Sequence, residues 1–450
     1  MENVTVVTDY RLIIDNLKKD EFQGRPDFGL WEDRNSGKRN RGVLLCDGPV
    51  WQEQRRFVLR GLRDFGFGKE SMEGMLIHEL QELQNTLKND IGHPVSLAGV
   101  FNASVLNSLW HIVTGNRFEL TDPTLKNLIK LLIEVIGYCQ FEMSVLFKDT
   151  SCTYVKLLLF CSNVSNLLIT TPALFFYWPV KNGLMGRKMF KSSLKFREDV
   201  RLLLQKVIDE HWDTYKEGEA RDFVDAYIEQ IKATNSDSSS FYSEEGSNTF
   251  LILWSYCKTV ASLAETTSTT LQWAALYSLT FPECRRRFKM KLTMSLDDLD
   301  LQAEEINPAV LNEVHRMCSL IPVSVYHKAV QDSEIGGYFI PKNSVVFFSI
   351  YDAHHDAGYW GDPNSFRPER FLDKSETKLI RHEPLIPFSS GKRQCLGETL
   401  ARDTLFLFFA GLLQTFTFEI DPVSSNNDLK GTPSFISAPK PFKVILKERK

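Results

Sequence analysis

A single cysteine near the C-terminus stands in a setting that suits metal ligation. Residues 388–397 read Phe-Ser-Ser-Gly-Lys-Arg-Gln-Cys-Leu-Gly, which places Cys395 in a turn between two glycines and close to Lys392 and Arg393. A thiolate needs positive charge and backbone N–H donors around it to stay ionised and to bind a metal. The alternative is a buried structural cysteine in a turn that leads into the apolar run 405–413.

A second chemical feature is an acid beside a hydroxyl in the middle of an apolar helix. The stretch from Trp254 to Leu279 is mostly apolar, and its small and polar centre includes Glu265 and Thr266. Both are poor choices for stability, because a charge resists burial and a threonine hydroxyl competes for backbone hydrogen bonds. Their presence therefore indicates a function.

Charged residues at helical spacing predict a buried ion network. Glu313 and Arg316 are three residues apart, so they share one helix face and can form a salt bridge. Their neighbours are apolar, which indicates a partly buried pair that needs a third partner. The segment 366–371, Phe-Arg-Pro-Glu-Arg-Phe, offers Arg370 for this position.

Another helix face carries an aromatic and a basic side chain. Trp51 and Arg55 are four residues apart and therefore lie one turn from each other. A guanidinium is suited to bidentate binding of a carboxylate. The alternative is an ordinary amphipathic helix with basic residues on its outer side.

Together these segments resemble the motifs of the cytochrome P450 superfamily. Residues 388–397 meet the pattern F-x-x-G-x-R-x-C-x-G at every defined position, and five motifs follow in the family's order between Val4 and Phe442. The resemblance is closest to the microsomal type that handles drugs, steroids and lipid hormones, and an insect origin is expected. It implies a mainly α fold with a small β-sheet, a single domain over residues 1–450, and haem b as cofactor.

The resemblance assigns roles around the haem. Cys395 would be the thiolate axial ligand, which pushes electron density onto the iron and favours O–O cleavage. Arg55 would bind one propionate with Trp51 packed beside it, and His327 would pair with the other propionate. The other cofactor-binding residues of the cysteine loop would be Phe388, Gly391 and Arg393. The network behind the haem would consist of Glu313, Arg316 and Arg370.

The acid–hydroxyl pair would serve oxygen activation. By resemblance to the motif A-G-x-E-T-T, Thr266 would be the relay hydroxyl and Glu265 its acid partner, a form of general acid catalysis. Leu263 stands where the family has glycine. A local π-bulge could instead restore a small pair at 261–262.

Composition fits one large helical core. The chain has 450 residues with 43% hydrophobic and 12% aromatic content, and no long linker or repeat interrupts it. Most segments read as helical, and strand signals are few, with 345–348 among them. The net charge of −4 gives no support for a nucleic-acid partner. Eight cysteines without a C-x-x-C pair favour a reducing compartment.

The N-terminal region predicts a chain that begins inside the family fold. Residues 1–23 show no signal peptide, and no window reaches about 18 apolar residues, the length of a membrane span. The membrane anchor and the first strands are therefore expected to be missing. The main sheet, which includes residues 345–348, would then be short of partner strands and would have an open edge. Residues 157–180 are interpreted as a buried helix and loop, or as a surface that dips into a bilayer.

The resulting hypothesis is a haem-thiolate monooxygenase. An NADPH-dependent flavoprotein reductase would supply electrons at the basic side around Lys392 and Arg393, and an apolar steroid, lipid hormone or xenobiotic would be oxidised. Substrate contacts are expected from 102–109, 157–176 and 323–326. The resemblance also implies the cytosolic face of the endoplasmic reticulum membrane. Alternatives are a haem-thiolate isomerase or dehydratase that uses no dioxygen, and a truncated haem-binding relic.

Overall fold

The computed structural model describes most of the chain. The described residues are 3–26, 42–44, 46–66, 70–130, 198, 202, 204–234, 239–241, 247–281, 306–375, 378–423, 429–432 and 436–449, with the backbone alone described at 70, 247–263 and 306–307. The predictions for 157–176 and 157–180 lie outside these residues.

Helices dominate the described part of the chain, as the sequence predicts. The helices are α1 (Tyr10–Lys18), α3 (Gly48–Asp64), α4 (Glu70–Lys88), α5 (Val100–Thr114), α10 (Phe223–Ala233), α11 (Ser247–Thr280), α13 (Ile306–Cys318), α14 (Ile350–His355), α15 (Ala357–Trp360) and α16 (Glu398–Thr415). Short 3₁₀ turns occur at η1 (Asp20–Phe22), η4 (Pro368–Phe371) and η5 (Gly391–Arg393).

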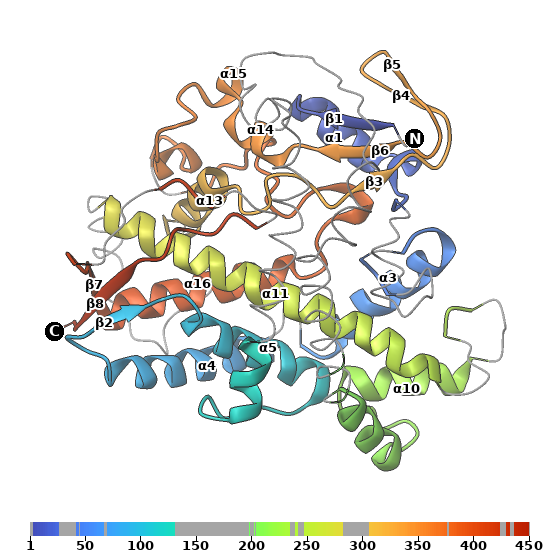
Figure 1. Ribbon diagram of the computed structural model, residues 1–450, viewed down its shortest axis with the longest axis horizontal. Coiled ribbons are helices and arrows are strands. Elements are labelled where there is room, and N and C mark those ends of the chain that lie inside the picture. The colour runs from blue at the N-terminus through green and yellow to red at the C-terminus, as the bar shows by residue number, and fades with distance from the viewer. Residues whose placement is uncertain are drawn as a thin grey trace, which may run out of the picture.

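The long helix α11 lies at the centre of the helical packing. It crosses the middle of the view in Figure 1 and packs against α5, α10, α13 and α16. Helix α16 is buried on nearly all sides, since the run from Leu405 to Leu413 is apolar and contributes to the main hydrophobic core. A helix that is hydrophobic all round needs such an interior position. The two helices thus hold the cysteine loop, which directly precedes α16, against the core.

Helix α1 forms a second, smaller core with the main sheet. The side chain of Asp9 caps α1 by accepting hydrogen bonds from the backbone N–H groups of Arg11 and Leu12, at 2.9 and 3.1 Å. An N-cap of this kind satisfies donors that the first helical turn leaves free. The apolar face of α1, with Ile13 and Leu17, then packs on strand residues of the sheet.

Three small sheets are present among the described residues. The strands are β1 (Val4–Val7), β2 (Pro94–Ser96), β3 (His327–Lys328), β4 (Ser333–Ile335), β5 (Tyr338–Ile340), β6 (Val345–Phe348), β7 (Phe416–Ile420) and β8 (Lys443–Glu448). They pair in the orders β1-β6-β3, β2-β8-β7 and β4-β5.

Strand β6 has a partner on each side, although the sequence predicted a main sheet short of partner strands. In the first sheet β6 is the central strand, with Val4 opposite Val345 in parallel register on one side and His327 opposite Val346 in antiparallel register on the other. Residues 4–7 are themselves a buried strand, so they supply the partner that the sequence reading did not find. The open edge that was expected lies instead on the outer side of β1, as far as the described residues show.

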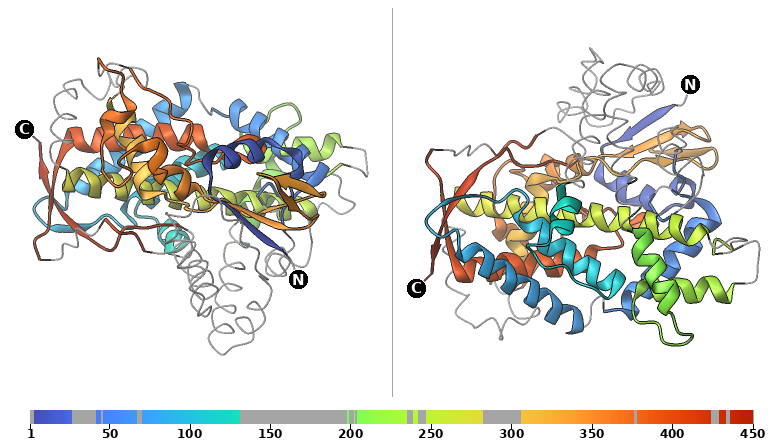
Figure 2. Two further views of the ribbon diagram at one scale, coloured as in Figure 1. Left: turned by 90° about the horizontal axis from the view of Figure 1, so that it is seen from above. Right: turned by 60° about the horizontal axis from the view of Figure 1, so that its bottom comes forward.

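The ends of the chain lie on opposite sides of the molecule. The N-terminus is beside the sheet of β1, β3 and β6, and the C-terminus is beside β7 and β8 (Figure 2). Among the described helices, none combines the length and the apolar character needed to cross a bilayer.

Candidate haem site

The backbone of the cysteine loop folds back on itself. The N–H of Cys395 donates to the carbonyl of Phe388 at 3.0 Å, and the N–H of Gln394 donates to the carbonyl of Gly391 at 3.2 Å. Gly391 has φ +70°, and a Cβ atom there would collide with the carbonyl of Leu17 at the end of α1. Glycine is required on both counts, because other residues adopt this φ only with strain and would not fit against α1. The loop is therefore seated on α1.

The thiol of Cys395 has both a backbone donor and a cation near it. Burial raises its pKa and the charge of Glu398 adds to the rise, while the N–H of Gly397 and the guanidinium of Arg55 act in the opposite direction. The cysteine also lies just before the N-terminus of α16, which carries partial positive charge. Burial therefore favours the neutral thiol, and a bound metal cation would favour the thiolate.

Helix α3 touches the cysteine loop through the predicted tryptophan and arginine. The guanidinium of Arg393 lies 3.6 Å from the centre of the Trp51 ring, and that of Arg55 lies 6.0 Å from it. Arg55 also donates from Nη2 to the carbonyl of Gln394 at 2.6 Å. The structure thus brings together residues of two motifs that are more than 300 positions apart in the sequence.

A third guanidinium joins these two. Arg25 is buried, and burial, together with the nearby charges of Arg393 and Arg55, holds its pKa well below the usual range. Burial likewise lowers the pKa of Arg393 to about 10. We call Arg25, Arg55 and Arg393 the basic cluster. Among the described residues, Asp47 is the carboxylate whose charge acts on Arg25 and Arg393, and it also pairs with Lys328 at 3.2 Å.

Two buried donors beside the basic cluster have no acceptor. The indole Nε1 of Trp51 and Nη1 of Arg393 are both buried, and neither has a hydrogen-bond partner in the described protein. Buried polar atoms are nearly always paired, so each exception needs an explanation. Unpaired donors next to an excess of positive charge indicate a place for an anionic acceptor.

His327 lies beside the basic cluster in a neutral form. It is buried in β3, and its Nδ1–H donates to the carbonyl of Phe22 at 2.6 Å. Burial, reinforced by the charges of Arg25 and Arg393, lowers its pKa well below the ordinary value. In this form Nε2 is an acceptor and has no proton to give to a carboxylate. The predicted pairing with a propionate therefore needs a second proton on the ring, which a neighbouring carboxylate would favour.

The structure brings the three residues of the predicted ion network into contact. Arg316 donates from Nε and Nη2 to the two carboxylate oxygens of Glu313, at 2.7 and 2.8 Å. Arg370 donates from Nε to Glu313 at 3.2 Å and pairs with Asp362 at 3.1 Å. The remaining bonds of the two guanidiniums go mainly to backbone carbonyls, those of His354, Trp360, Asp362, Pro363 and Ser365. This buried network joins α13 to the segment that precedes the cysteine loop.

The acid of α11 points toward a neighbouring helix. One carboxylate oxygen of Glu265 accepts a hydrogen bond from Nδ2 of Asn102 on α5, and the other accepts from the hydroxyl of Thr269 at 3.4 Å. Burial raises the pKa of Glu265, and these two bonds act against the rise. Thr266 is half-buried. Helix α11 is continuous and α-helical from 247 to 280, so the suggested π-bulge is not formed, and the side chain of Leu263 lies outside the described atoms.

Sequence reasoning missed two contributions to this site. Arg25 follows Gly24, which forms an isolated β-bridge with Lys328 of β3. No motif links Arg25 to Trp51 in the sequence, so only its position between a glycine and a proline could have drawn attention to it. Residues 102–109, which are expected to contact substrate, are almost all buried in α5, which packs against α4 and α11. Asn102 in that segment donates a hydrogen bond to Glu265, which the sequence did not indicate.

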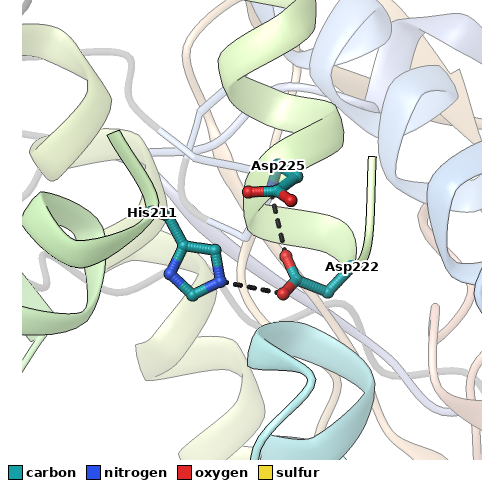
Figure 3. Close-up of side chains that lie close together, drawn as sticks. All are labelled: His211, Asp222 and Asp225. Carbon is teal, nitrogen blue, oxygen red and sulfur yellow. Dashed lines mark hydrogen bonds and ion pairs between the residues drawn. The ribbon is translucent and has the colours of Figure 1, made fainter. Parts of the chain in front are cut away.

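A separate cluster of titratable groups lies away from the cysteine loop. Figure 3 shows His211, Asp222 and Asp225, whose possible ligand atoms lie within 4.8 Å of one another. Both ring nitrogens of His211 already have acceptors, the carbonyl of Val207 at 2.7 Å and Asp222 at 2.8 Å. Both oxygens of Asp225 accept from Arg221. With its partners supplied by the protein, this cluster is an ion network that ties residues 204–214 to α10.

The fold and the site define a class of haem-thiolate proteins, and comparison with known proteins agrees. The family model "Cytochrome P450" matches residues 1–446, and the chain belongs to this family. It is therefore a cytochrome P450 enzyme, an oxidoreductase of the monooxygenase class, and haem and iron are the family's cofactor.

Relatives come from crustacean, insect and mammalian sources. The chain is 31% identical to cytochrome P450 2L1 of Panulirus argus over 98% of its own length and 85% of the relative's. It is 33% identical to human cytochrome P450 2J2 over 84% and 70% of the two chains. It is 30% identical to farnesoate epoxidase of Bombyx mori over 100% and 84%.

The residues present fit a haem group. Haem b carries two propionates, and the basic cluster with the unpaired donors of Trp51 and Arg393 is suited to such anions. The cysteine loop also offers the Cys395 thiol, which interacts electrostatically with Arg55 of the basic cluster. A cation-binding thiol and an anion-binding cluster that meet at the cysteine loop suit the iron and the propionates of the group.

Proposed function

We propose that this protein is a haem-dependent monooxygenase that inserts one atom of dioxygen into an apolar small molecule, a steroid, a lipid hormone or a xenobiotic. Electrons would come from an NADPH-dependent flavoprotein reductase. Residues 1–450 would act as one haem domain. The observation that carries the proposal is the meeting of α3 with the cysteine loop, where buried donors without acceptors lie beside the basic cluster.

In this proposal each group of residues holds one part of the cofactor. Sγ of Cys395 would hold the haem iron, in a loop shaped by Phe388 and Gly391. Arg25, Arg55 and Arg393 would bind the propionates, together with the indole N–H of Trp51, and His327 would add a further partner when it is protonated. The bound haem would supply the activation of dioxygen that the protein's own side chains cannot perform.

The protein's own catalytic contribution is proton delivery from α11. Glu265 is a carboxyl with a raised pKa, so it can hold a proton closer to neutral pH than an exposed glutamate can. Thr266, its neighbour, would pass a proton from its hydroxyl and regain one from Glu265. Because this pair is present, the proposal favours oxygen insertion over an isomerase or dehydratase reaction that uses no dioxygen.

The network of Glu313, Arg316 and Arg370 has a structural role in the proposal. It fixes the segment before the cysteine loop to α13, so that the loop keeps its register behind the haem.

We also propose that the protein lies at the cytosolic face of the endoplasmic reticulum membrane, where the flavoprotein reductase would also be found. Cell fractionation with a reductase marker tests it, and recovery of the protein away from the microsomal fraction would contradict it.

The test of the proposed function is the difference spectrum of the reduced, carbon-monoxide-bound protein after supply of haem. We expect the strongly red-shifted Soret band of thiolate-ligated haem. Cys395→Ser should lose this band, while Cys46→Ser, which alters a second buried cysteine near Arg25 and Arg393, should keep it. An unshifted band in the unaltered protein, or loss of the band in Cys46→Ser alone, would contradict the assignment of Cys395.

A further inference from the structure

The carboxylate of Glu265 is held by a neighbouring helix. Asn102 is 5% exposed, and its Nδ2 donates to one carboxylate oxygen of Glu265 across the contact between α5 and α11. Thr269, which is 1% exposed, donates to the other oxygen. Both oxygens therefore accept a hydrogen bond from a buried donor.

Helix α5 gives Asn102 a rigid base. Its residues are buried almost throughout, and it packs against α4, α10 and α11. Asn107 on the same helix donates to the carbonyl of Phe118 at 2.7 Å and accepts from the N–H of that residue at 3.1 Å. A side chain placed on such a helix can hold its partner in one rotamer.

The orientation of the Asn102 amide makes this contact favour one protonation state of Glu265. Asn102 turns its NH₂ group, and not its carbonyl oxygen, toward Glu265, and this group can only donate, so it binds a carboxylate oxygen better than the weaker acceptor of a neutral carboxyl group. When Glu265 takes up a proton, the bond from Asn102 weakens and the carboxyl can turn away from α5. Proton uptake and side-chain release are thus coupled.

We propose that Asn102 is a positioning residue which, together with Thr269, holds the ionised Glu265 against α5 and sets the point at which Glu265 takes a proton and is released. The proton comes from solvent and binds to a carboxylate oxygen; no other bond is made or broken. The role in oxygen chemistry rests on the proposed function, but the hold on Glu265 does not.

No charged side chain competes for control of Glu265 in the described structure. The causes that act on its pKa are burial, which raises it, and the bonds from Asn102 and Thr269, which lower it. The other elements that pack on α11, namely α10, α13, α16 and β7, contribute no charged group to it among the described residues. The hydrogen bonds from Asn102 and Thr269 are therefore the contacts that favour the ionised form of Glu265.

The direct test uses infrared difference spectroscopy on the ferric holoenzyme. The C=O band of the protonated carboxyl is followed against pH, and its loss in Glu265→Gln identifies it. In Asn102→Leu, which removes the donor at similar volume, we expect the band to appear about one pH unit higher, since a hydrogen bond to a charged group contributes about 1.5 kcal/mol or more. An unchanged titration would overturn the proposal.

A matched control lies on the same helix. Ser104 is fully buried, two residues from Asn102, and its hydroxyl has no partner in the described protein. Ser104→Ala should leave the titration of Glu265 unchanged, and a shift as large as that of Asn102→Leu would overturn the proposal. If Asn102→Leu does not take up haem, Thr269→Val replaces it. That variant should shift the band in the same direction by a smaller amount, and no shift there would again overturn the proposal.

A second readout separates this proposal from the proposed function. With the NADPH-dependent reductase and no organic substrate, the solvent deuterium isotope effect on NADPH consumption is measured for Glu265→Gln and Asn102→Leu. We expect both to change it. If the infrared band shifts but neither variant changes the isotope effect, Asn102 controls Glu265 while Glu265 is not the proton donor, so the catalytic role fails and the positioning role stands.

Discussion

Among the described residues, two groups of arginines differ in how their charge is matched. In the network of Glu313, Arg316 and Arg370, the guanidiniums share a carboxylate and give their other bonds to backbone carbonyls. In the basic cluster, Arg25 and Arg393 also donate to backbone carbonyls, but the charges of Arg393 and Arg55 lower the pKa of Arg25, and Nη1 of Arg393 has no acceptor. One group is complete within the protein, and the other is not.

This difference separates a scaffold from a binding site. A buried ion pair with all its partners contributes little net stability, but removing one partner leaves an uncompensated charge. The basic cluster instead keeps like charges close together and leaves a buried donor without an acceptor, which is costly from the start, and an anionic ligand removes that cost when it binds. Changes in the first group should therefore affect folding, and changes in the second should affect cofactor retention.

The largest effect is expected from breaking the complete network. Glu313→Gln leaves the guanidiniums of Arg316 and Arg370 buried without their carboxylate, at a cost of about 3–5 kcal/mol. We expect little folded holoprotein, measured by far-UV circular dichroism and by the reduced carbon-monoxide spectrum. As control, Glu419→Gln removes the half-exposed partner of Lys447 and should cost less than about 1 kcal/mol. Normal folding and haem content in Glu313→Gln would show that the network is dispensable.

The next effect should appear in haem retention without loss of the fold. Arg393→Met removes a proposed propionate partner, and we expect haem release to become about tenfold to a hundredfold faster. Transfer of haem to apomyoglobin measures the rate. The same substitution in the other group, Arg316→Met, should reduce the far-UV signal, because it removes two hydrogen bonds from the buried carboxylate of Glu313 and leaves Arg370 as its arginine partner. If the two variants lose helical structure to the same extent, the distinction between the groups does not hold.

His327, which lies beside the basic cluster, should make the stability of the protein depend on pH. The pKa of His327 lies below its value in the unfolded chain, so its contribution to stability is present above about pH 6.5 and is lost as the pH falls below that value. The loss is at most about 1.4 kcal/mol per pH unit. In His327→Asn, urea unfolding of the haem-free protein should depend less on pH between 7 and 5. An unchanged slope would mean that the ring is not held neutral.

His211 provides a comparison of opposite sign. Burial lowers its pKa, but the bonds to Asp222 and Val207 outweigh burial and raise it. The stability that this histidine contributes is therefore present below about pH 6.5 and is lost as the pH rises through its raised pKa. In the same urea assay, the free energy of unfolding should fall more steeply with decreasing pH in His211→Asn than in the unaltered protein. In His327→Asn it should fall less steeply.

The smallest effect should come from a single N–H group. Trp51→Phe keeps a ring under Arg393 and removes only the indole donor that lacks a protein partner. We expect haem release to become about fivefold faster, equivalent to about 1 kcal/mol, with no loss of fold. Trp273→Phe removes a donor that is bonded to the carbonyl of Ser437 at 2.7 Å, so it should lower stability and leave haem release unchanged. A reversal of these two results would contradict the ligand-binding role of Trp51.

Local spacing explains which parts of the site the sequence could reveal. Glu313 and Arg316 are one helical turn apart, and Cys395 stands among glycines and cations, so both were visible within ten residues. Contacts over long separations were not. Asn102 reaches Glu265 across 163 positions, and nothing in its neighbours marks it as a partner. The main sheet shows the same limit, because pairing of Val4 with Val345 depends on tertiary structure rather than on either strand alone.

The seat of the cysteine loop on α1 has a consequence for the order of folding. Arg393 donates to the carbonyl of Gln23, which is 370 positions earlier, and Gly391 is pressed against Leu17. Closing so long a loop is entropically unfavourable and tends to come late in folding. During synthesis the first helix has to remain without this partner until residue 393 has left the ribosome. We therefore expect haem to be captured after translation of nearly all of the sequence, and not by a partly made chain.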